Sequence, residues 1–197
     1  MTRQLLTSTI VVVSLLAGCS STPPAPKSQT ASATKPVDRY SKDQVGRLTY
    51  CVGLTDTAWS IATMKLAGKS KEEVRKSYAN HPNPTLITAE IDEVFSNSIS
   101  RAWDYSVQFF RDCAVNVANV ATASTDTGAY CMQNAMLSGL AQEHKAAGMS
   151  KKQAYESLPI PGETPKALVD AVYKNSDDRA NAMLNAWNTC IAPVTNR

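Results

Sequence analysis

The chain has few of the residues that catalysis or nucleic-acid binding needs. Aromatic residues make up 7% of its 197 residues, and 20 Lys and Arg are balanced by 17 Asp and Glu. It therefore lacks the aromatic stacking surface and the basic footprint of a nucleic-acid-binding protein. Its only histidines are His81 and His144, and no motif places a nucleophile or a second ligand beside either one. There is no GxSxG, no HExxH and no phosphate-binding loop. These absences predict a chain that is not an enzyme and has no cofactor and no nucleic-acid partner.

Nothing in the sequence indicates a β-strand. It has no long run in which apolar and polar residues alternate, and it has no Asn-Gly turn. Apolar residues recur instead at helical spacing. The clearest series is Leu48, Cys51, Leu54, Ala58, Ile61, Ala62 and Leu66. The sequence therefore predicts an all-α fold with no sheet.

The five cysteines are an odd number, and they are isolated from one another. No CxxC pair is present, whereas zinc sites and redox centres usually cluster their cysteines. We therefore expect structural disulfides and no metal site. One cysteine must then serve another purpose, and Cys19 is distinguished by its position at the end of a short apolar run.

The segment before Cys19 has the features of an export signal. Residues 5–16 are mostly apolar and too few to span a bilayer, which takes about 20 residues. The stretch LAGC, residues 16–19, resembles the lipobox of bacterial lipoproteins. This resemblance implies that residues 1–18 are cleaved off as a signal peptide and that acyl chains such as palmitate on Cys19 anchor the protein in a membrane. The alternative is an ordinary signal peptide with an incidental cysteine.

The residues after Cys19 suggest an address and a tether. In lipoproteins of Gram-negative bacteria an Asp at the next position favours the inner membrane, so Ser20 implies an outer-membrane anchor that faces the periplasm. Residues 19–38 are rich in Ser, Thr, Pro and Ala and have no apolar periodicity. We therefore expect them to form a lipidated, disordered tether.

The remainder of the chain contains an internal repeat. Equivalent positions are separated first by 80 residues, then by 78 and finally by 77, so small deletions are enough to relate the copies. The matched segments are 51–74 with 131–154, 91–98 with 169–176, and Cys113 with Cys190. The sequence predicts two units, 39–117 and 127–197, joined by a linker at 118–126.

Each unit is expected to have four helices in the order long, short, short, long. The first helix should run over residues 42–66 and stop at Gly68, a residue that accepts the left-handed conformation of a helix end. Ser70 with Glu73, and Ser150 with Gln153, have the spacing of a capping box and predict the start of the second helix in each unit. Helix starts are also expected at Pro84, at Pro165 and after Asn97-Ser98 and Asn175-Ser176, and the acidic pair Asp177 and Asp178 suits a helix N-terminus.

The repeat selects one disulfide pairing out of the three that four cysteines allow. Each unit has one cysteine early in its first helix and one late in its last helix. If those two helices pack antiparallel, these ends meet. We therefore predict Cys51–Cys113 and Cys131–Cys190, which an oxidising compartment outside the inner membrane would allow to form.

Other shared and unshared residues suggest further roles. Lys65 and Lys145 are equivalent, as are Asp92 and Asp170, and we expect these pairs to hold each unit together at its surface, with a salt bridge as one possible form. Trp59 and Trp103 have no tryptophan counterpart in the second unit. They are expected either to pack within or between the units or to bind a partner.

The repeated pattern also suggests a general role. The order of residues in each unit is similar to that of small exported one-unit proteins of Proteobacteria. This order is a cysteine, a basic residue, a Gly-x-Ser turn, a hydrophobic-Asp-x-Val-aromatic segment and a second cysteine. The resemblance implies fold and compartment but no activity. We expect a non-enzymatic, protein-binding lipoprotein with a groove between its two units and an envelope or secreted protein as its partner. A periplasmic immunity protein against a toxin that degrades the cell wall, and a secretion-system pilotin, are the more specific alternatives.

Overall fold

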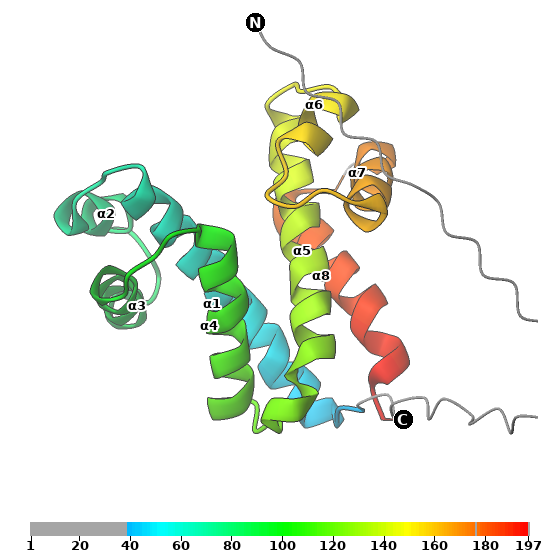
Figure 1. Ribbon diagram of the computed structural model, residues 1–197, viewed down its shortest axis with the longest axis horizontal. Helices are drawn as coiled ribbons and strands as arrows, with labels where there is room; N and C mark the ends of the chain where they lie inside the picture. Colours follow the sequence, from blue (N-terminus) through cyan, green and yellow to red (C-terminus); the bar gives the residue numbers. More distant parts are fainter. Residues whose placement is uncertain (1–38, 176, 197) are drawn as a thin grey trace, which may run out of the picture. The chain divides into compact units, whose positions relative to one another are not determined.

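The computed structural model describes residues 39–175 and 177–196, and Figure 1 shows their arrangement. Within these ranges there are eight α-helices and no strand, so the predicted all-α class is confirmed. The helices of the first unit, called repeat one below, are α1 (Lys42–Leu66), α2 (Lys71–Ser77), α3 (Pro84–Ser96) and α4 (Ala102–Asn116). Those of repeat two are α5 (Thr125–Ala146), α6 (Lys151–Glu156), α7 (Glu163–Lys174) and α8 (Arg179–Ile191).

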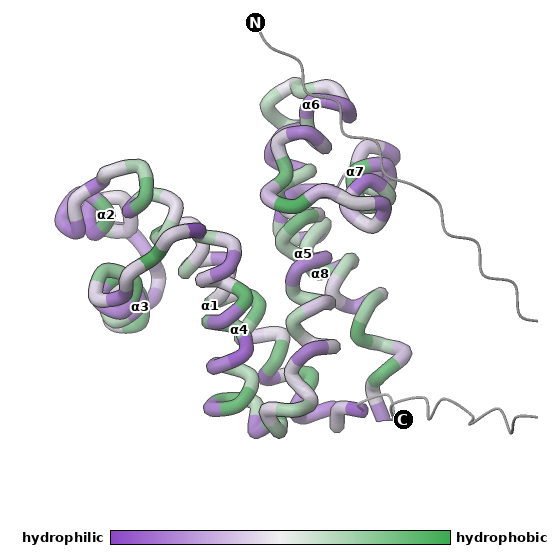
Figure 2. Tube along the Cα trace, viewed as in Figure 1, coloured by the Kyte–Doolittle hydropathy of each residue, from purple (hydrophilic) through white to green (hydrophobic). Residues whose placement is uncertain are grey.

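Both repeats use the same devices to end their first helix and to begin their second. Ser70 and Ser150 each accept a hydrogen bond from the backbone three residues on, and Glu73 and Gln153 bond back to them, so both predicted capping boxes are present. Gly68 and Gly148 have φ angles of 83° and 78°, the left-handed conformation that glycine adopts without strain. The short helices α2 and α6 that follow these turns are largely hydrophilic (Figure 2).

Two disulfides join the long helices of each repeat, as the sequence predicted. They are Cys51–Cys113 and Cys131–Cys190, with Cα–Cα distances of 5.8 Å and 5.4 Å. Each one links the first and last helix of its own repeat, and α1–α4 and α5–α8 are also the two most extensive helix pairs in the described part of the chain. Each bond closes a loop of about 60 residues, which stabilises a small helical unit by roughly 4 kcal/mol in the chain-entropy model.

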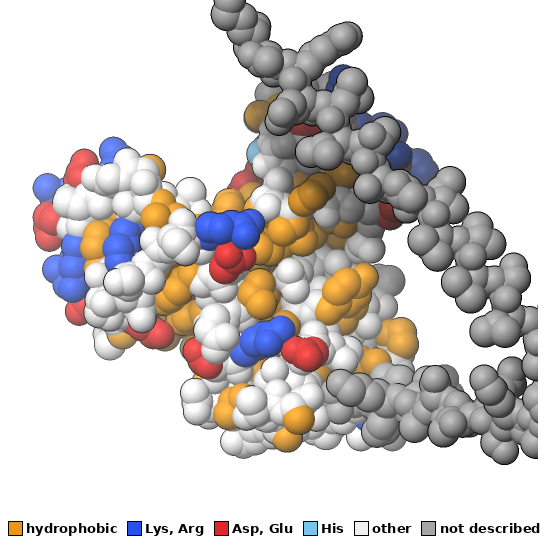
Figure 3. All heavy atoms as spheres, viewed as in Figure 1, with side chains coloured by type: hydrophobic (Ala, Val, Ile, Leu, Met, Phe, Trp, Pro, Cys, Tyr) orange, Lys and Arg blue, Asp and Glu red, His pale blue; other side chains and the backbone are white. Residues whose placement is uncertain are grey.

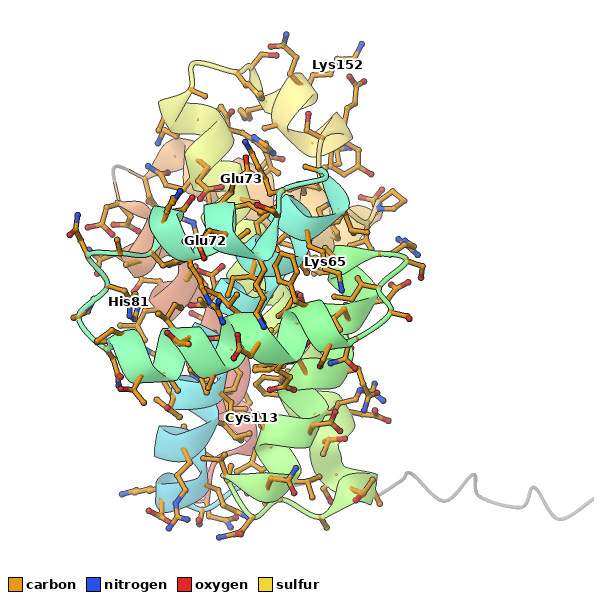
Figure 4. The ribbon with its side chains drawn as sticks, turned by 90° about the vertical axis from the view of Figure 1, so that its left-hand side faces the viewer. Lys65, Glu72, Glu73, His81, Cys113 and Lys152 are labelled. Atoms are coloured by element: carbon orange, nitrogen blue, oxygen red, sulfur yellow. A yellow bond between two sulfur atoms is a disulfide. The ribbon has the colours of Figure 1, made fainter. Side chains whose placement is uncertain are left out.

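The equivalent lysines do not pair with the equivalent aspartates. Lys65 Nζ donates to the carbonyl oxygens of Val94 and Asn97, at 2.9 Å and 2.5 Å, and so neutralises the carbonyl end of α3 (Figure 4). Lys145 Nζ makes the same contacts with Val172 and Asn175 at the end of α7. A cation at a helix C-terminus satisfies carbonyls that have no partner within the helix, which explains why both repeats carry a lysine here.

The equivalent aspartates bond to the short second helices instead. Asp92 accepts from Lys71 at 2.8 Å and from Arg75 at 2.7 Å, and Asp170 accepts from Lys151 at 2.9 Å. The lysine hydrogen bonds lower the pKa of both carboxyl groups. These half-exposed pairs tie α2 to α3 and α6 to α7, which corrects the partners suggested by the sequence.

Several expected helix boundaries differ from those observed. The third helix of repeat two begins at Glu163, so Pro165 lies in its first turn, and Asn97 and Asn175 follow the C-terminal ends of α3 and α7. The fourth helix of repeat one begins after Arg101 without a side-chain cap, whereas Asp178 caps α8. The paired asparagines therefore mark helix ends, where Lys65 and Lys145 bond to their carbonyls, and not helix starts.

The two repeats share one apolar core. Leu48, Cys51 and Phe110 of repeat one lie in the same buried cluster as Met132 and Trp187 of repeat two. The described residues of both repeats belong to one compact unit, so the repeats pack as a single body. Residues Ala118 and Val120 of the expected linker are 1% and 3% exposed, and α5 begins at Thr125, so the connection itself is part of the fold.

Equivalent residues meet where the repeats touch. Phe110 on α4 and Trp187 on α8 occupy matching positions, and their rings make an edge-to-face contact with centroids 6.3 Å apart. The rest of the contact between the repeats is not symmetric, because α4 packs extensively along α5 whereas the corresponding pair, α8 and α1, make few contacts.

Tyr40 joins the start of the folded part to its end. Its backbone N–H donates to Val194 and its carbonyl accepts from Asn196, at 2.9 Å and 2.8 Å. Its hydroxyl donates to the Ser124 carbonyl at 2.6 Å and accepts from Gly128 at 3.0 Å. The side chain is 2% exposed, so the point at which the predicted tether joins the fold is firmly held.

A buried carboxyl group distinguishes repeat one. Glu90 on α3 is 5% exposed among Ile87 and Ile91, and neither of its carboxylate oxygens makes a hydrogen bond of ordinary geometry. Burial, assisted by the nearby Glu93, raises the pKa of Glu90 to about 8. At the matching position repeat two has Leu168, an apolar residue packed against the shared core.

This group should make stability depend on pH. Between the ordinary pKa of about 4.5 and the folded value of about 8, the unfolded chain releases a proton that the folded chain retains. The free energy of unfolding should therefore fall by up to roughly 4 kcal/mol as the pH rises through this window. Glu90→Gln should abolish this dependence, and exposed Glu72→Gln should retain it, in urea denaturation series at several pH values. Equal slopes in wild type and Glu90→Gln would contradict the assignment.

Candidate functional site

A groove between the repeats is the main candidate for binding another protein. It lies between α1 and α8, has a volume of about 260 Å³ and is called the inter-repeat groove below. Its lining is mostly apolar. The lining residues are Thr49, Val52, Gly53, Asp56, Arg179, Ala180, Met183, Leu184 and Trp187.

The floor of the inter-repeat groove is rigid. Trp187 is 1% exposed, and its indole Nε1 donates to Thr49 Oγ1 at 2.8 Å. Thr49 in turn donates to the carbonyl of Val45 one turn earlier in α1. This chain of hydrogen bonds orients the tryptophan across the boundary between the repeats and satisfies its only polar group.

A glycine in α5 leaves room for the side chain of Met183 on α8. A side chain at Gly139 would place its Cβ 2.7 Å from Cγ of Met183, closer than atoms can approach. Because Gly139 has no side chain, Met183 lies against the α5 backbone and forms one wall of the inter-repeat groove. Repeat one has Trp59 and Ser106 at the matching positions, so the large and small residues are exchanged between the copies.

The rim of the inter-repeat groove exposes apolar surface. Leu184 on α8 is 45% exposed, and Gly53 on α1 has open space where a side chain would project. In Figure 3, by contrast, lysine, arginine, aspartate and glutamate side chains crowd the lobe formed by α2 and α3. An apolar recess beside an exposed leucine suits one large apolar side chain of a partner protein.

An ion cluster at the inter-repeat groove joins three helices. Arg179 on α8 binds both carboxylate oxygens of Asp56 on α1, at 2.7 Å and 2.5 Å. Its Nε lies 2.5 Å from Oε1 of Glu143 on α5. The hydrogen bonds that Arg179 donates to Asp56 raise the pKa of Arg179, so the guanidinium stays charged. This bidentate pair crosses the repeat boundary and helps to determine the width of the groove.

The tryptophans singled out from the sequence lie elsewhere. Trp103 is 5% exposed within the shared core, and Trp59 is half-buried against the same core. Neither lines the inter-repeat groove. The groove depends instead on Trp187 of α8, which the sequence did not single out. The sequence did carry a signal of the groove, because Trp59 of repeat one corresponds to Gly139 of repeat two and this difference marks a change in packing between the copies.

The other predicted sites have separate outcomes. Both disulfides are present, whereas Cys19 lies outside the described residues. In residues 39–175 and 177–196, no three side chains from His, Cys, Asp and Glu gather as metal ligands would. His81 lies in an exposed turn and bonds to Asn83, and the half-buried His144 lies in the last turn of α5. Over the same ranges, no helix has the length and apolar character to span a membrane.

Comparison with known proteins gives no relative from which to transfer a function. No protein-family model matches the chain, and neither the curated proteins nor the solved structures include a significant match. The functional argument therefore depends on the residues of this chain alone.

The Asp56–Arg179 pair should be a measurable link between the repeats. Removing either partner leaves a partly buried charge without its counterpart, so Asp56→Ala should lower the free energy of unfolding by about 1–2 kcal/mol. In a double-mutant cycle with Arg179→Ala, the coupling energy should exceed about 0.5 kcal/mol. Chemical denaturation of the four proteins measures it. The surface pair Asp43 and Arg47 is the matched control, and a coupling no larger than that of the control would contradict the prediction.

Proposed function

We propose that the chain is a non-enzymatic, protein-binding lipoprotein, anchored through Cys19 and facing the periplasm. The LAGC stretch supports the anchor, and Ser20 supports the outer membrane as its location. The two disulfides support a compartment outside the reducing cytoplasm, because such bonds persist where thiols are oxidised. The protein would then act at a membrane surface without crossing it.

The observation that carries the binding role is the inter-repeat groove. Its apolar walls, its rigid tryptophan floor and the exposed Leu184 form a recess that both repeats contribute to. The partner would be an envelope or secreted protein that inserts one large apolar side chain between α1 and α8. An immunity role and a pilotin role are both forms of this proposal, since each requires a protein partner in the envelope.

Loss of Cys19 should release the protein from the membrane. In Cys19→Ser the acyl chains have no sulfur to attach to, so the protein should move from the membrane fraction to the soluble fraction. Mass spectrometry of the mature N-terminus and fractionation of the envelope measure this change. Ser20→Asp is the matched variant, because it should keep the acyl chains and shift the protein toward the inner membrane. A Cys19→Ser protein that still carried acyl chains would exclude the proposed anchor.

Filling the inter-repeat groove should abolish partner binding without harming the fold. Gly53→Leu places a side chain in open space at the rim, and replacing a helical glycine should raise helix stability by about 0.8 kcal/mol. Gly46→Leu is the matched control, since Gly46 lies on the same helix, is equally open and does not line the groove. A photo-crosslinking residue at Leu184 should label a discrete envelope protein in wild type and in Gly46→Leu.

The same label should be lost in Gly53→Leu. Thermal unfolding of both glycine variants checks that each is folded. If Gly53→Leu and Gly46→Leu gave the same crosslinked product in the same yield, the inter-repeat groove would not be the binding site.

A further inference from the structure

A second hollow lies within repeat two, away from the inter-repeat groove. It is an open hollow lined by residues of α5, α7 and α8 and has a volume of about 520 Å³, which lies within the range of small-molecule sites. We call it the repeat-two pocket. Along α5 it is lined by Asn134, Ser138 and Gln142, which are spaced by four residues and therefore share one face of the helix.

Repeat one has no such face, although its framework is the same. Where α5 carries these three polar residues, α1 carries Leu54, Ala58 and Ala62. Ala58 and Ala62 are completely buried in an apolar cluster that belongs to repeat one alone. The polar character of the α5 face is therefore particular to the second copy.

The opposite wall of the pocket, on α8, carries smaller residues than the matching helix of repeat one. Tyr105 and Phe109 on α4 pack against the apolar cluster of repeat one. The matching residues on α8 are Ala182 and Ala186, which line the repeat-two pocket. In repeat one, two aromatic rings therefore fill this space. In repeat two, two alanine methyl groups leave it open. Large-to-small changes and buried polar groups both cost stability, so a stability requirement alone does not explain their coincidence here.

The polar groups of the pocket have hydrogen-bonding capacity to spare. Gln142 Oε1 is buried and makes no hydrogen bond within the described part of the chain. Asn134 is 8% exposed, and its amide nitrogen contacts Cys190 Sγ at 3.6 Å, a weak acceptor. A ligand that offers its own donors and acceptors to these amides would remove an unfavourable feature of the free protein.

The charge of the pocket restricts the ligand. Among the described residues that line it there is no lysine or arginine, and the one ionisable carboxylate among them, Asp177, accepts from the amide of Asn185 at 3.1 Å. An anion would therefore find no counter-charge. Tyr130 is 51% exposed and presents an aromatic face at the pocket, a surface on which the carbon face of a sugar ring can stack.

We propose that the repeat-two pocket binds an uncharged saccharide that carries acetamido groups. The amides of Asn134 and Gln142 are complementary to the N–H and C=O of an acetamido group, and Ser138 is complementary to ring hydroxyls. The methyl groups of Ala182 and Ala186 provide an apolar surface for the acetyl methyl. The inference is independent of the inter-repeat groove, because the two sites share no lining residue.

Calorimetric titration of the purified full chain with di-N-acetylchitobiose tests the proposal. We expect saturable binding that cellobiose, the same sugar pair with hydroxyls in place of acetamido groups, does not reproduce. Gln142→Ala should weaken binding about tenfold or more, because one buried hydrogen bond is lost. Gln133→Ala is the matched control on the same helix and should bind as wild type, since Gln133 lies outside the pocket.

A second variant tests the shape of the site. Ala186→Phe restores the residue of repeat one and should abolish binding, with thermal unfolding as the check on folding. If this variant does not fold, the comparison of Gln142→Ala with Gln133→Ala decides the question. Equal affinity for cellobiose, equal binding by Gln142→Ala and wild type, or no saturable binding of di-N-acetylchitobiose would each overturn the proposal. Gly53→Leu should leave saccharide binding intact, which separates this site from the protein-binding role.

Discussion

The contact between Phe110 and Trp187 is the constraint on which the rest of the structure depends. These equivalent aromatic residues, one on the last helix of each repeat, meet in the shared core, where α4 of repeat one also packs along α5 of repeat two. The disulfides attach the first helices to the same pair, and the Trp187–Thr49 hydrogen bond connects the copies a second time. With the centre held in this way, the short helices at the periphery can differ without loss of the fold.

Much of this framework was predictable because its causes are local in the sequence. The capping boxes at Ser70 and Ser150 and the left-handed glycines depend on residues only a few positions apart. The disulfide pairing also required that the first and last helices of each unit pack antiparallel. The matching positions of the cysteines in the two copies indicated this packing. The expected first helix, residues 42–66, matches the observed boundaries for the same reason.

The candidate sites were less predictable because they depend on which residues meet in space. The sequence showed Lys65 and Asp92 as conserved between the copies but not that each binds a different helix. It likewise gave no sign that Trp187 would form the floor of a groove. The exchanges at Trp59, Tyr105 and Phe109 were visible in the alignment of the repeats. Their meaning required knowing which side chains meet between α5 and α8, such as Met183 against Gly139.

The duplication within the chain also has an evolutionary consequence. In a symmetric dimer of two identical units every substitution occurs twice, so a residue that opens a pocket in one subunit opens it in both. Two copies joined in one chain are free of that restriction. One half can then conserve a filled, stabilising interior while the other half acquires a cavity, and the division of labour between scaffold and receptor becomes accessible to selection.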